Sequence, residues 1–445
     1  MRNYLDAYFI QTADIDLTEA TAEGGTFYND GSGWSPIGTN RNTPFAGSYD
    51  GGGHRIIGLK SKRSGYSAQY AGLFGYNQGV IRNLEMESGT VSSSSSTPSS
   101  SYAGGIAGYN DYDGSISNCY NTGAVSSSSS SSSSYAYAGG IAGYNYNGSI
   151  SNCYNTGAVS SSSSYAGGIA GDNDGSISNC YNTGEITAES DSENVYAGGI
   201  AGYSTSEIAN VFNTGKVTAQ TGGTNKYAYV GGLAGYTKGG GISYGYSTGE
   251  VQGSPQYTGK VVGNNEGGTF SRLYFIGTYE DMGVGNTGNS RDRVEFKTAE
   301  QMKQQATYVG FDFNTVWSIS PDKNGGYPTL QVFSASEDVP GAPTETDATI
   351  TLSQTSYDEA TETYRLTAAL QNQRDQALAG TVVAAAYNGT RLIGMQKYPI
   401  DALAANGSQT VQAEIRTNNK ATQLKVFFWD VDTLQPLSNV EKTAG

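Results

Sequence analysis

A short block of residues recurs seven times between residues 70 and 263 of this chain, and this repeat limits the possible folds more than any other feature. The block reads Tyr-Ala-Gly-Gly-Ile-Ala-Gly in its most regular copies and changes slightly in the others. A period of this length is typical of solenoids, in which each repeat forms one coil that packs on the coils before and after it. Successive copies begin 28 to 35 residues apart, at Tyr70, Tyr102, Tyr137, Tyr165, Tyr196, Tyr229 and Tyr257.

A second block follows the first and carries the pattern Ser-Ile-Ser-Asn-Cys-Tyr-Asn-Thr-Gly. It begins at Ser115, Ser149 and Ser176, and looser versions begin at Glu207 and Gly241. The extra length of the longer repeats falls after this block, in serine-rich runs. Short runs of β-forming residues bounded by Gly and Asn, without a helical stripe, indicate strands. The repeat therefore predicts an all-β fold, a right-handed parallel β-helix (solenoid) whose coils lie about 4.8 Å apart.

Three positions of the repeat hold mainly small apolar residues and are predicted to face the interior. Ile106, Ile116 and Cys119 represent these three columns. Because Ile116 and Cys119 are three residues apart, a straight strand cannot direct both side chains inward. Asn118 between them is therefore predicted to form a corner in the left-handed conformation. The equivalent asparagines are predicted to share side-chain hydrogen bonds along the stack: Asn118, Asn152, Asn179 and Asn210.

The solenoid is expected to occupy residues 1–333. Irregular entry coils are assigned to 1–66, the regular repeats to 67–268 and a C-terminal cap to 269–333. Within the cap, Thr298-Ala299-Glu300-Gln301 has the pattern of a capping box. This pattern predicts a helix from Thr298 to about Tyr308.

A change of composition marks the end of the solenoid. Residues 334–347 are acidic and contain two prolines, which indicates a linker. From residue 348 to 445, short runs of alternating apolar and polar residues replace the repeat. This spacing predicts a small immunoglobulin-like or fibronectin-like β-sandwich.

The two blocks of the repeat together resemble the GLUG motif family. Among the copies, Gly72-Leu73-Phe74-Gly75 is most similar to the letters that give the motif its name. The resemblance covers about residues 5 to 331. Such repeats occur in bacterial surface proteins and filamentous adhesins. The resemblance therefore implies an exported, β-helical, adhesin-like protein, and it supplies no catalytic residues. The last domain is similar to accessory β-sandwiches on surface proteins of Gram-positive bacteria.

The charge and hydropathy of the chain exclude several classes of partner. With 40 Asp and Glu residues against 25 Lys and Arg, the formal net charge is −15. An acidic chain repels phosphate backbones, so no nucleic acid is expected as a partner. No run of about 18 apolar residues occurs, so no transmembrane segment is predicted. A signal peptide and an anchor are expected to lie outside this chain, and the chain is expected to be a monomer without cofactors.

Few side chains have the chemistry of an active site. His54, the single histidine, lies in a Gly-rich turn and is predicted to be structural. The three cysteines, Cys119, Cys153 and Cys180, fall in one column and are expected to be buried thiols. A disulfide between adjacent coils is an alternative, because stacked Cα atoms about 4.8 Å apart lie within the allowed range. A metal site is less favoured, because three sulfurs in a line lack a fourth ligand.

Two acidic turns are similar to pieces of calcium-binding loops. Asp111-Tyr112-Asp113-Gly114 and Asp172-Asn173-Asp174-Gly175 lack the glutamate that closes an EF-hand, so ordinary turns and no metal are expected. Enzymes that cleave polysaccharides need paired carboxylates or clustered basic residues, and the coils have almost no charge at fixed positions. We therefore expect no enzymatic activity. The alternative is a carbohydrate-active β-helix enzyme.

Aromatic residues form three columns in the predicted stack. Stacked rings stabilise a solenoid by about 0.5–1.5 kcal/mol per pair, and a column that faces solvent would also suit sugar rings. The candidate ligand-binding residues belong to one column, Tyr102, Tyr137, Tyr165, Tyr196 and Tyr229. The other two columns hold Tyr76, Tyr109, Tyr144, Tyr203 and Tyr236, and Tyr120, Tyr154, Tyr181, Phe212 and Tyr246.

A column of threonines suggests ice binding as a further alternative. It contains one residue per coil, whereas a flat ice-binding face normally uses two. The sequence as a whole predicts an extracellular bacterial cell-surface protein for adhesion or display. Its expected partner is a host or environmental glycan, or a surface protein. The threonines of the column are Thr122, Thr156, Thr183, Thr214 and Thr248.

Overall fold

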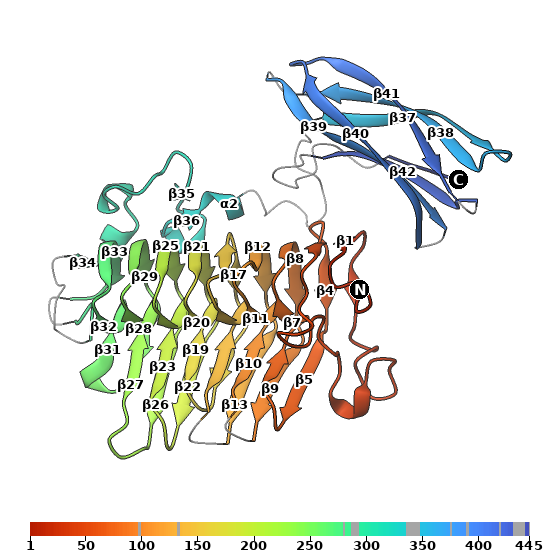
Figure 1. The fold of residues 1–445 in the computed structure, drawn as a ribbon. Helices are drawn as coiled ribbons and strands as arrows, with labels where there is room; N and C mark the ends of the chain where they lie inside the picture. Colours follow the sequence, from red (N-terminus) through yellow and green to blue (C-terminus); the bar gives the residue numbers. More distant parts are fainter. Residues whose placement is uncertain are drawn as a thin grey trace. The chain divides into compact units, whose positions relative to one another are not determined.

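The chain folds into two compact units, Met1–Gly341 and Ala342–Gly445 (Figure 1). The computed structural model describes residues 1–96, 99–130, 134–278, 281–285, 293–334, 348–373, 376–388, 391–417, 420–429 and 441–444. Apart from Ser334, the predicted linker 334–347 lies outside these described residues.

One repeat of the first unit forms one coil with four strands. In one such coil these are β10 (Ser101–Gly104), β11 (Ala107–Asn110), β12 (Ser115–Asn121) and β13 (Ala124–Ser129). Equivalent strands of neighbouring coils pair in parallel and in register, so that Tyr102 lies opposite both Tyr70 and Tyr137. The stack of coils is visible as rows of parallel arrows in Figure 1. The predicted all-β parallel solenoid is confirmed.

The stacked strands form four parallel sheets in the described part of this unit. The first is made of β6 (Gln69–Ala71), β10, β14 (Ala136–Gly139), β19 (Tyr165–Gly167), β23 (Val195–Gly198), β27 (Ala228–Gly231) and β31 (Thr258–Gly259). The second is made of β7 (Phe74–Asn77), β11, β15 (Ala142–Asn145), β20 (Ala170–Asn173), β24 (Ala201–Ser204), β28 (Ala234–Lys238) and β32 (Val262–Glu266).

The third sheet also includes the entry coils and the start of the cap. It is made of β1 (Tyr8–Ile10), β2 (Ile15–Asp16), β3 (Ser48–Asp50), β4 (Arg55–Ile57), β8 (Val80–Glu87), β12, β16 (Ser149–Ser151), β17 (Tyr154–Asn155), β21 (Ser176–Asn182), β25 (Glu207–Asn213), β29 (Gly241–Ser247), β33 (Thr269–Ile276) and β34 (Val294–Lys297). The fourth is made of β5 (Lys60–Gly65), β9 (Thr90–Ser95), β13, β18 (Val159–Ser161), β22 (Ile186–Ser190), β26 (Val217–Thr221) and β30 (Val251–Gln252). Two single 3-10 turns, η1 (Asn29–Gly31) and η2 (Pro255–Tyr257), lie in the connections.

The interior is built from the apolar columns that the repeat predicts. Ile106, Ile116 and Cys119 are all fully buried in one hydrophobic core. Asn118 has a φ of 51°, in the left-handed region, and this corner directs both Ile116 and Cys119 inward within one strand. The predicted corner is therefore present, and its equivalents Asn152, Asn179 and Asn210 have φ values of 53° to 54°.

Asparagine side chains form hydrogen-bonded ladders along the stack. The predicted corner ladder is present in part, because Asn179 donates its amide to Asn152 at 3.1 Å. Two further ladders are buried. In each, one amide donates to the next carbonyl oxygen at 2.7–2.8 Å. They consist of Asn121, Asn155, Asn182 and Asn213, and of Asn77, Asn110, Asn145 and Asn173.

The cap contains a much shorter helix than predicted. The capping box is present, since Thr298 Oγ1 accepts from the Gln301 backbone N–H at 3.2 Å and Gln301 Oε1 accepts from that of Thr298 at 2.9 Å. The α-helix, α1 (Ala299–Met302), nevertheless ends after one turn, and a 3-10 turn, η3 (Gln305–Thr307), follows. The predicted helix to Tyr308 is wrong because the Tyr308 hydroxyl donates to the Met302 carbonyl at 2.7 Å and draws the chain back on itself.

The remaining part of the cap carries aromatic and apolar side chains onto the third sheet. It contains β35 (Trp317–Ser318), η4 (Asn324–Gly326), β36 (Thr329–Leu330) and α2 (Gln331–Ser334). Its buried side chains form one cluster with the aromatic residues of that sheet.

The second unit consists of two antiparallel sheets around one hydrophobic core, which is consistent with the predicted β-sandwich. One sheet is made of β37 (Ala348–Asp358), β38 (Thr363–Asn372) and β41 (Ser408–Arg416). The other is made of β39 (Leu378–Asn388), β40 (Arg391–Leu403), β42 (Gln423–Trp429) and β43 (Glu441–Ala444).

Candidate functional site

Two of the three aromatic columns lie side by side on the outer surface of the solenoid. The first tyrosine column stands on the first sheet and the second tyrosine column on the second sheet, so the two are separated only by the bend between these sheets. We call them together the tyrosine double column. Its first column contains Tyr70, Tyr102, Tyr137, Tyr165, Tyr196 and Tyr229, and its second contains Tyr76, Tyr109, Tyr144, Tyr203 and Tyr236.

The rings of the first column stack face to face along its whole length. Neighbouring centroids are 4.8–5.0 Å apart and the ring planes differ by only 2–12°. Each ring within the column therefore has a tyrosine on both faces, and only its edge and hydroxyl group remain for contact. Tyr137 and Tyr229 are 8% and 9% exposed, whereas Tyr102, Tyr165 and Tyr196 are half-buried.

The second column packs its rings edge-on against the first. Tyr102 and Tyr109 meet at 5.3 Å with an angle of 76° between the ring planes, and Tyr196 and Tyr203 meet at 5.9 Å and 89°. The glycine between the two columns lies where the backbone is closely packed. A Cβ atom on Gly108 would lie 3.0 Å from backbone atoms of Ala71 and Gly75 in the preceding coil and 3.1 Å from the backbone oxygen of Tyr102.

One aspartate interrupts the second column. Asp172 pairs with Tyr144 on one side and with Tyr203 on the other, and it is 7% exposed. Tyr144 departs from the pattern of its neighbours, because its ring lies parallel to Tyr137 at 5.4 Å and its hydroxyl donates to Asp174. Among the described residues, Asp172 Oδ1 has no hydrogen-bond partner, and burial raises the pKa of this carboxyl well above its ordinary value.

Burial also extends the pH range over which the tyrosine hydroxyls stay protonated. It raises the pKa of Tyr102 and of Tyr203 to about 12, and it raises that of Tyr137 further, with the nearby Asp172 as the second cause. At neutral pH the double column therefore presents neutral hydroxyl groups, each of which can both donate and accept a hydrogen bond.

The remaining aromatic column is covered by the cap. We call it the capped column. Its first four rings stack at 4.2–4.8 Å, and Phe333 of α2 packs its ring edge-on against three of them. Toward the C-terminal end, the column joins the buried cluster of the cap. The capped column consists of Tyr120, Tyr154, Tyr181, Phe212, Tyr246 and Tyr274.

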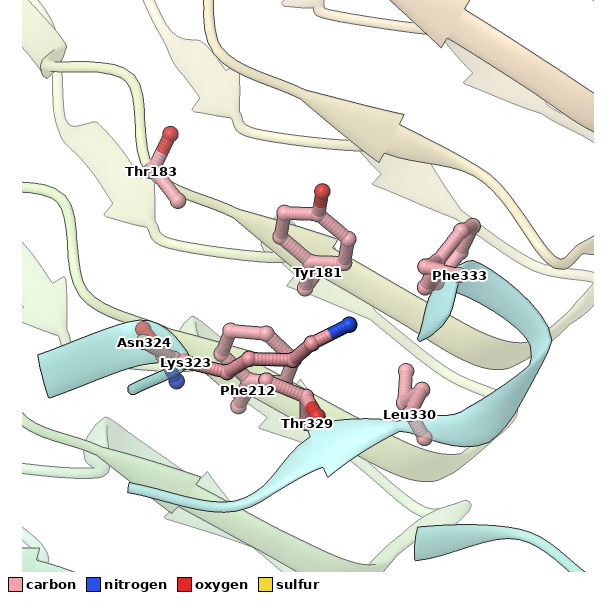
Figure 2. A pocket seen from close by; sticks show the side chains of 8 residues that line it. All are labelled: Tyr181, Thr183, Phe212, Lys323, Asn324, Thr329, Leu330 and Phe333. Carbon is pink, nitrogen blue, oxygen red and sulfur yellow. The ribbon is translucent and has the colours of Figure 1, made fainter. Parts of the chain in front are cut away.

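A pocket remains between the capped column and the cap (Figure 2). We call it the cap pocket. It has a volume of about 210 Å³, and sequence patterns did not indicate it because the cap does not follow the repeat. Residues of the solenoid form one side and residues of the cap form the other. They are Tyr181, Thr183, Phe212, Lys323, Asn324, Thr329, Leu330 and Phe333.

The two acidic turns lie close together on the surface of the stack. Asp113 and Asp174 line one shallow hollow of about 430 Å³, together with Glu207. Asp174 also accepts a hydrogen bond from the hydroxyl of Tyr144. Within the described ranges, no group of three or more His, Cys, Asp or Glu side chains is placed to hold a metal ion.

The cysteine column is part of the core. Cys119, Cys153 and Cys180 are free and buried, so the alternative of a disulfide between coils is wrong. Each thiol instead points to the backbone oxygen of the serine two residues before it, at 3.1–3.2 Å. Burial raises the pKa of Cys153 and Cys180 well above the ordinary value, which makes these thiols unreactive.

His54 and the threonine column have local contacts. His54 Nδ1 lies 3.4 Å from an oxygen of Asp14, in the entry coils. Thr122 Oγ1 accepts a hydrogen bond from the backbone N–H of Ser88 at 2.9 Å. The threonines stand at the bend between the third and fourth sheets, one in each coil, and not on a flat sheet face.

Comparison with known proteins identifies the repeats. The family described as the GLUG motif matches residues 99–126, 134–160 and 162–187. The chain is 44% identical over 84 residues to halomucin of Haloquadratum walsbyi, which covers 18% of this chain and 1% of halomucin. It is 41% identical over 90 residues to a protein of Evansella cellulosilytica named as a putative Gly-rich membrane protein, which covers 19% of this chain and 9% of that protein.

The chain thus spans only a small part of the length of these two relatives. In the part of the chain that the structure describes, no helix combines the length and the apolar character needed to cross a membrane. The coils between residues 99 and 187 are GLUG-motif repeats, as the two blocks of the sequence predicted.

Proposed function

We propose that this chain is an extracellular bacterial surface protein for adhesion or display, without enzymatic activity, and that its tyrosine double column contacts a linear glycan. The GLUG-motif repeats and the local similarity to halomucin and to a Gly-rich membrane protein support a role at the cell surface. The proposal that the chain contacts a glycan rests on the continuous first column of stacked tyrosines.

The repeat distance of this column suits an extended polymer. The rings follow one another at 4.8–5.0 Å, a distance close to the length of one sugar residue in an extended polysaccharide. Because the ring faces are occupied by neighbouring rings, a glycan would be bound by ring edges and hydroxyl groups. These hydroxyls are donors at neutral pH, as in any tyrosine, and the raised pKa of residues such as Tyr102 extends this to alkaline pH.

A glycan array with a triple variant tests this proposal. Changing Tyr102, Tyr165 and Tyr196 together to Phe removes three hydroxyls but keeps the stacked rings. We expect this variant to lose at least about 10-fold in affinity, since each lost hydrogen bond contributes about 0.5–1.5 kcal/mol. Circular dichroism spectra of the variant and of the unchanged protein should coincide.

Exposed tyrosines outside the double column provide the matched control. Tyr66 and Tyr112 are 80% and 66% exposed, and their change to Phe should leave glycan binding unaltered. Equal affinity of the Tyr102, Tyr165 and Tyr196 variant and the control would contradict the role of the double column. Release of new reducing ends from a bound polysaccharide would support the alternative of a carbohydrate-active enzyme.

A further inference from the structure

Three tyrosines at the edges of the tyrosine double column are exposed to solvent. Tyr135 is 48% exposed, Tyr227 40% and Tyr146 39%. Tyr135 directly precedes the strand β14 of the first sheet and Tyr227 precedes β27 of the same sheet, whereas Tyr146 directly follows β15 of the second sheet. We call these three residues the border tyrosines.

Each border tyrosine is in ring contact with the double column. The centroid distances are 5.7 Å between Tyr135 and Tyr165, 5.8 Å between Tyr146 and Tyr144, and 6.1 Å between Tyr227 and Tyr229. Inside the first column the rings follow one another at 4.8–5.0 Å. A tyrosyl radical formed on one ring can therefore take an electron from the next ring, which moves the radical along the column to a border tyrosine.

Two carboxylates are placed to take up the proton that a tyrosine loses on oxidation. Removal of an electron from a phenol makes its hydroxyl a strong acid, so oxidation is easier where a base already accepts the hydrogen bond of that hydroxyl. The hydroxyl of Tyr144 donates to Asp174, and that of Tyr236 donates to Glu266 at 2.5 Å. Both tyrosines belong to the second column, and Tyr144 is also the ring that contacts Tyr146.

Only the border tyrosines combine contact with the column and access to another molecule. A ring inside the first column, such as Tyr137, has a tyrosine on both faces and is nearly fully buried. Its neighbours are held at the spacing of the paired strands, which is too long for a covalent bond between rings. Rings inside the column can thus pass on a radical, but they cannot meet a ring of a second chain.

We infer that the double column is a relay for tyrosine oxidation, and that the border tyrosines form covalent dityrosine links with those of a second copy of this chain. The oxidant is hydrogen peroxide, used by a haem peroxidase that acts on the surface of the protein. Two tyrosines, one from each chain, each lose one electron and the hydroxyl proton.

The two radicals then form one carbon–carbon bond between the ring positions next to the hydroxyl-bearing carbons. Each of these two ring carbons loses its hydrogen as a proton, and each phenolic oxygen regains one. The peroxide takes up two electrons and two protons in total and becomes two molecules of water. A layer of chains linked in this way would be joined by bonds that reducing agents do not break.

Treatment of the full chain with hydrogen peroxide and a haem peroxidase tests this inference. We expect dityrosine after acid hydrolysis, and a dimer that persists in a denaturing gel with reductant. Changing Tyr135, Tyr146 and Tyr227 together to Phe keeps the three rings but removes the hydroxyls that are oxidised. This border variant should lose most of the dimer, with an unchanged circular dichroism spectrum.

A matched control changes three tyrosines that are more exposed than the border tyrosines, at 66–76%. In the described part of the chain, no ring contact joins them to the double column. This control variant should form as much dimer as the unchanged chain. Because exposure alone favours the control residues, a loss confined to the border variant can only come from contact with the column. The control residues are Tyr4, Tyr8 and Tyr112.

The relay itself is tested by removing the two proton acceptors. Asp174→Asn combined with Glu266→Gln keeps groups of the same shape and leaves the border tyrosines unchanged. Its dimer should form more slowly than that of a control with Asp191→Asn and Glu189→Gln, which changes two exposed carboxylates.

Four results would overturn the inference. They are absence of dityrosine in the treated chain, dityrosine without a dimer, equal dimer yields of the border variant and the tyrosine control, and equal rates of the two carboxylate variants. Glycan binding plays no part in these measurements, so their outcome is independent of the proposed function.

Discussion

Asp172 occupies a position that is tyrosine in both neighbouring coils. Its carboxyl group is buried beside the rings of the double column, with one oxygen unpaired. Because burial raises its pKa well above 3.8, the folded chain keeps this proton at pH values where the unfolded chain releases it. The free energy of unfolding therefore decreases as the pH rises above about 4.

Replacing this carboxyl by an amide should stabilise the protein at neutral pH. For Asp172→Asn we expect a gain of at least about 1.4 kcal/mol at pH 7, because an amide needs no proton to be buried, whereas each unit by which burial raises the pKa of Asp172 costs about 1.4 kcal/mol of stability at a pH above that pKa. The gain should disappear below about pH 4, where Asp172 is protonated in both states. Urea unfolding at the two pH values measures it, with the exposed Asp191→Asn as the control. A gain that does not depend on pH would contradict the assignment of a buried, protonated carboxyl.

Asn155 is an example of a buried ladder residue whose side chain makes several hydrogen bonds. Its amide donates to the carbonyl of Gly157 at 2.7 Å and to Asn182 Oδ1 at 2.8 Å, and its oxygen accepts from Asn121 at 2.8 Å. Asn155→Ala removes these three hydrogen bonds and leaves one N–H of the buried Asn121 amide without its acceptor, whereas Asn182 Oδ1 keeps the backbone N–H of Gly184 and the Asn121 amide keeps the carbonyl of Gly123. We expect a loss of at least about 2 kcal/mol in the free energy of unfolding, measured in denaturant.

The adjacent threonine provides the comparison for this change. Thr156 is exposed, so Thr156→Ala should change stability by less than about 0.5 kcal/mol. If both variants were equally stable, the ladder would contribute no more than a surface side chain.

At the level of elements, the tyrosine columns make the stability of the sheets change with pH in the alkaline range. Burial raises the pKa of Tyr102 to about 12, and the other rings of the first column also have raised pKa values. Between about pH 10 and 12 the folded chain binds more protons than the unfolded chain, so the free energy of unfolding falls as the pH rises. Below about pH 10 this contribution is fully present.

We therefore expect these tyrosines to ionise together with unfolding of the solenoid. Ultraviolet absorption of tyrosinate and the far-ultraviolet circular dichroism signal should change over the same pH range for this set of residues. The Tyr102→Phe and Tyr165→Phe changes should make the loss of stability with pH less steep. Complete ionisation of all tyrosines near pH 10 in a chain with unchanged circular dichroism would show that the column is not buried as described.

At the level of the whole molecule, the two compact units have separate hydrophobic cores. The core of the solenoid and that of the second unit have no residue in common. Residues that share one hydrophobic core unfold together as one cooperative unit. Because this chain has two cores, we expect two transitions in scanning calorimetry of the full chain. Chains that consist of residues 1–341 and 342–445 should each reproduce one of them. A single transition in the full chain, absent from both parts, would show that the units depend on each other.

The repeat in the amino-acid sequence is sufficient to predict the solenoid, its strand columns and its corners. In a stack of coils, equivalent positions of successive repeats lie directly above one another, so a column in the sequence becomes a column in space. For this reason the sequence alone places Ile106, Ile116 and Cys119 inside and Asn118 at a corner. The same stacking aligns the tyrosines at equivalent positions of successive repeats into columns.

What each column contacts depends on the folded chain. The sequence does not show that Tyr102 and Tyr109 meet across a bend, that the ring faces of the first column are covered, or that Asn155 is inside. It also does not predict the cap pocket, because Lys323 and Phe333 lie outside the repeat and reach Tyr181 only through the path of the cap. Regular stacking makes local positions predictable, whereas contacts between a column and a non-repeating segment depend on packing that no period in the sequence encodes.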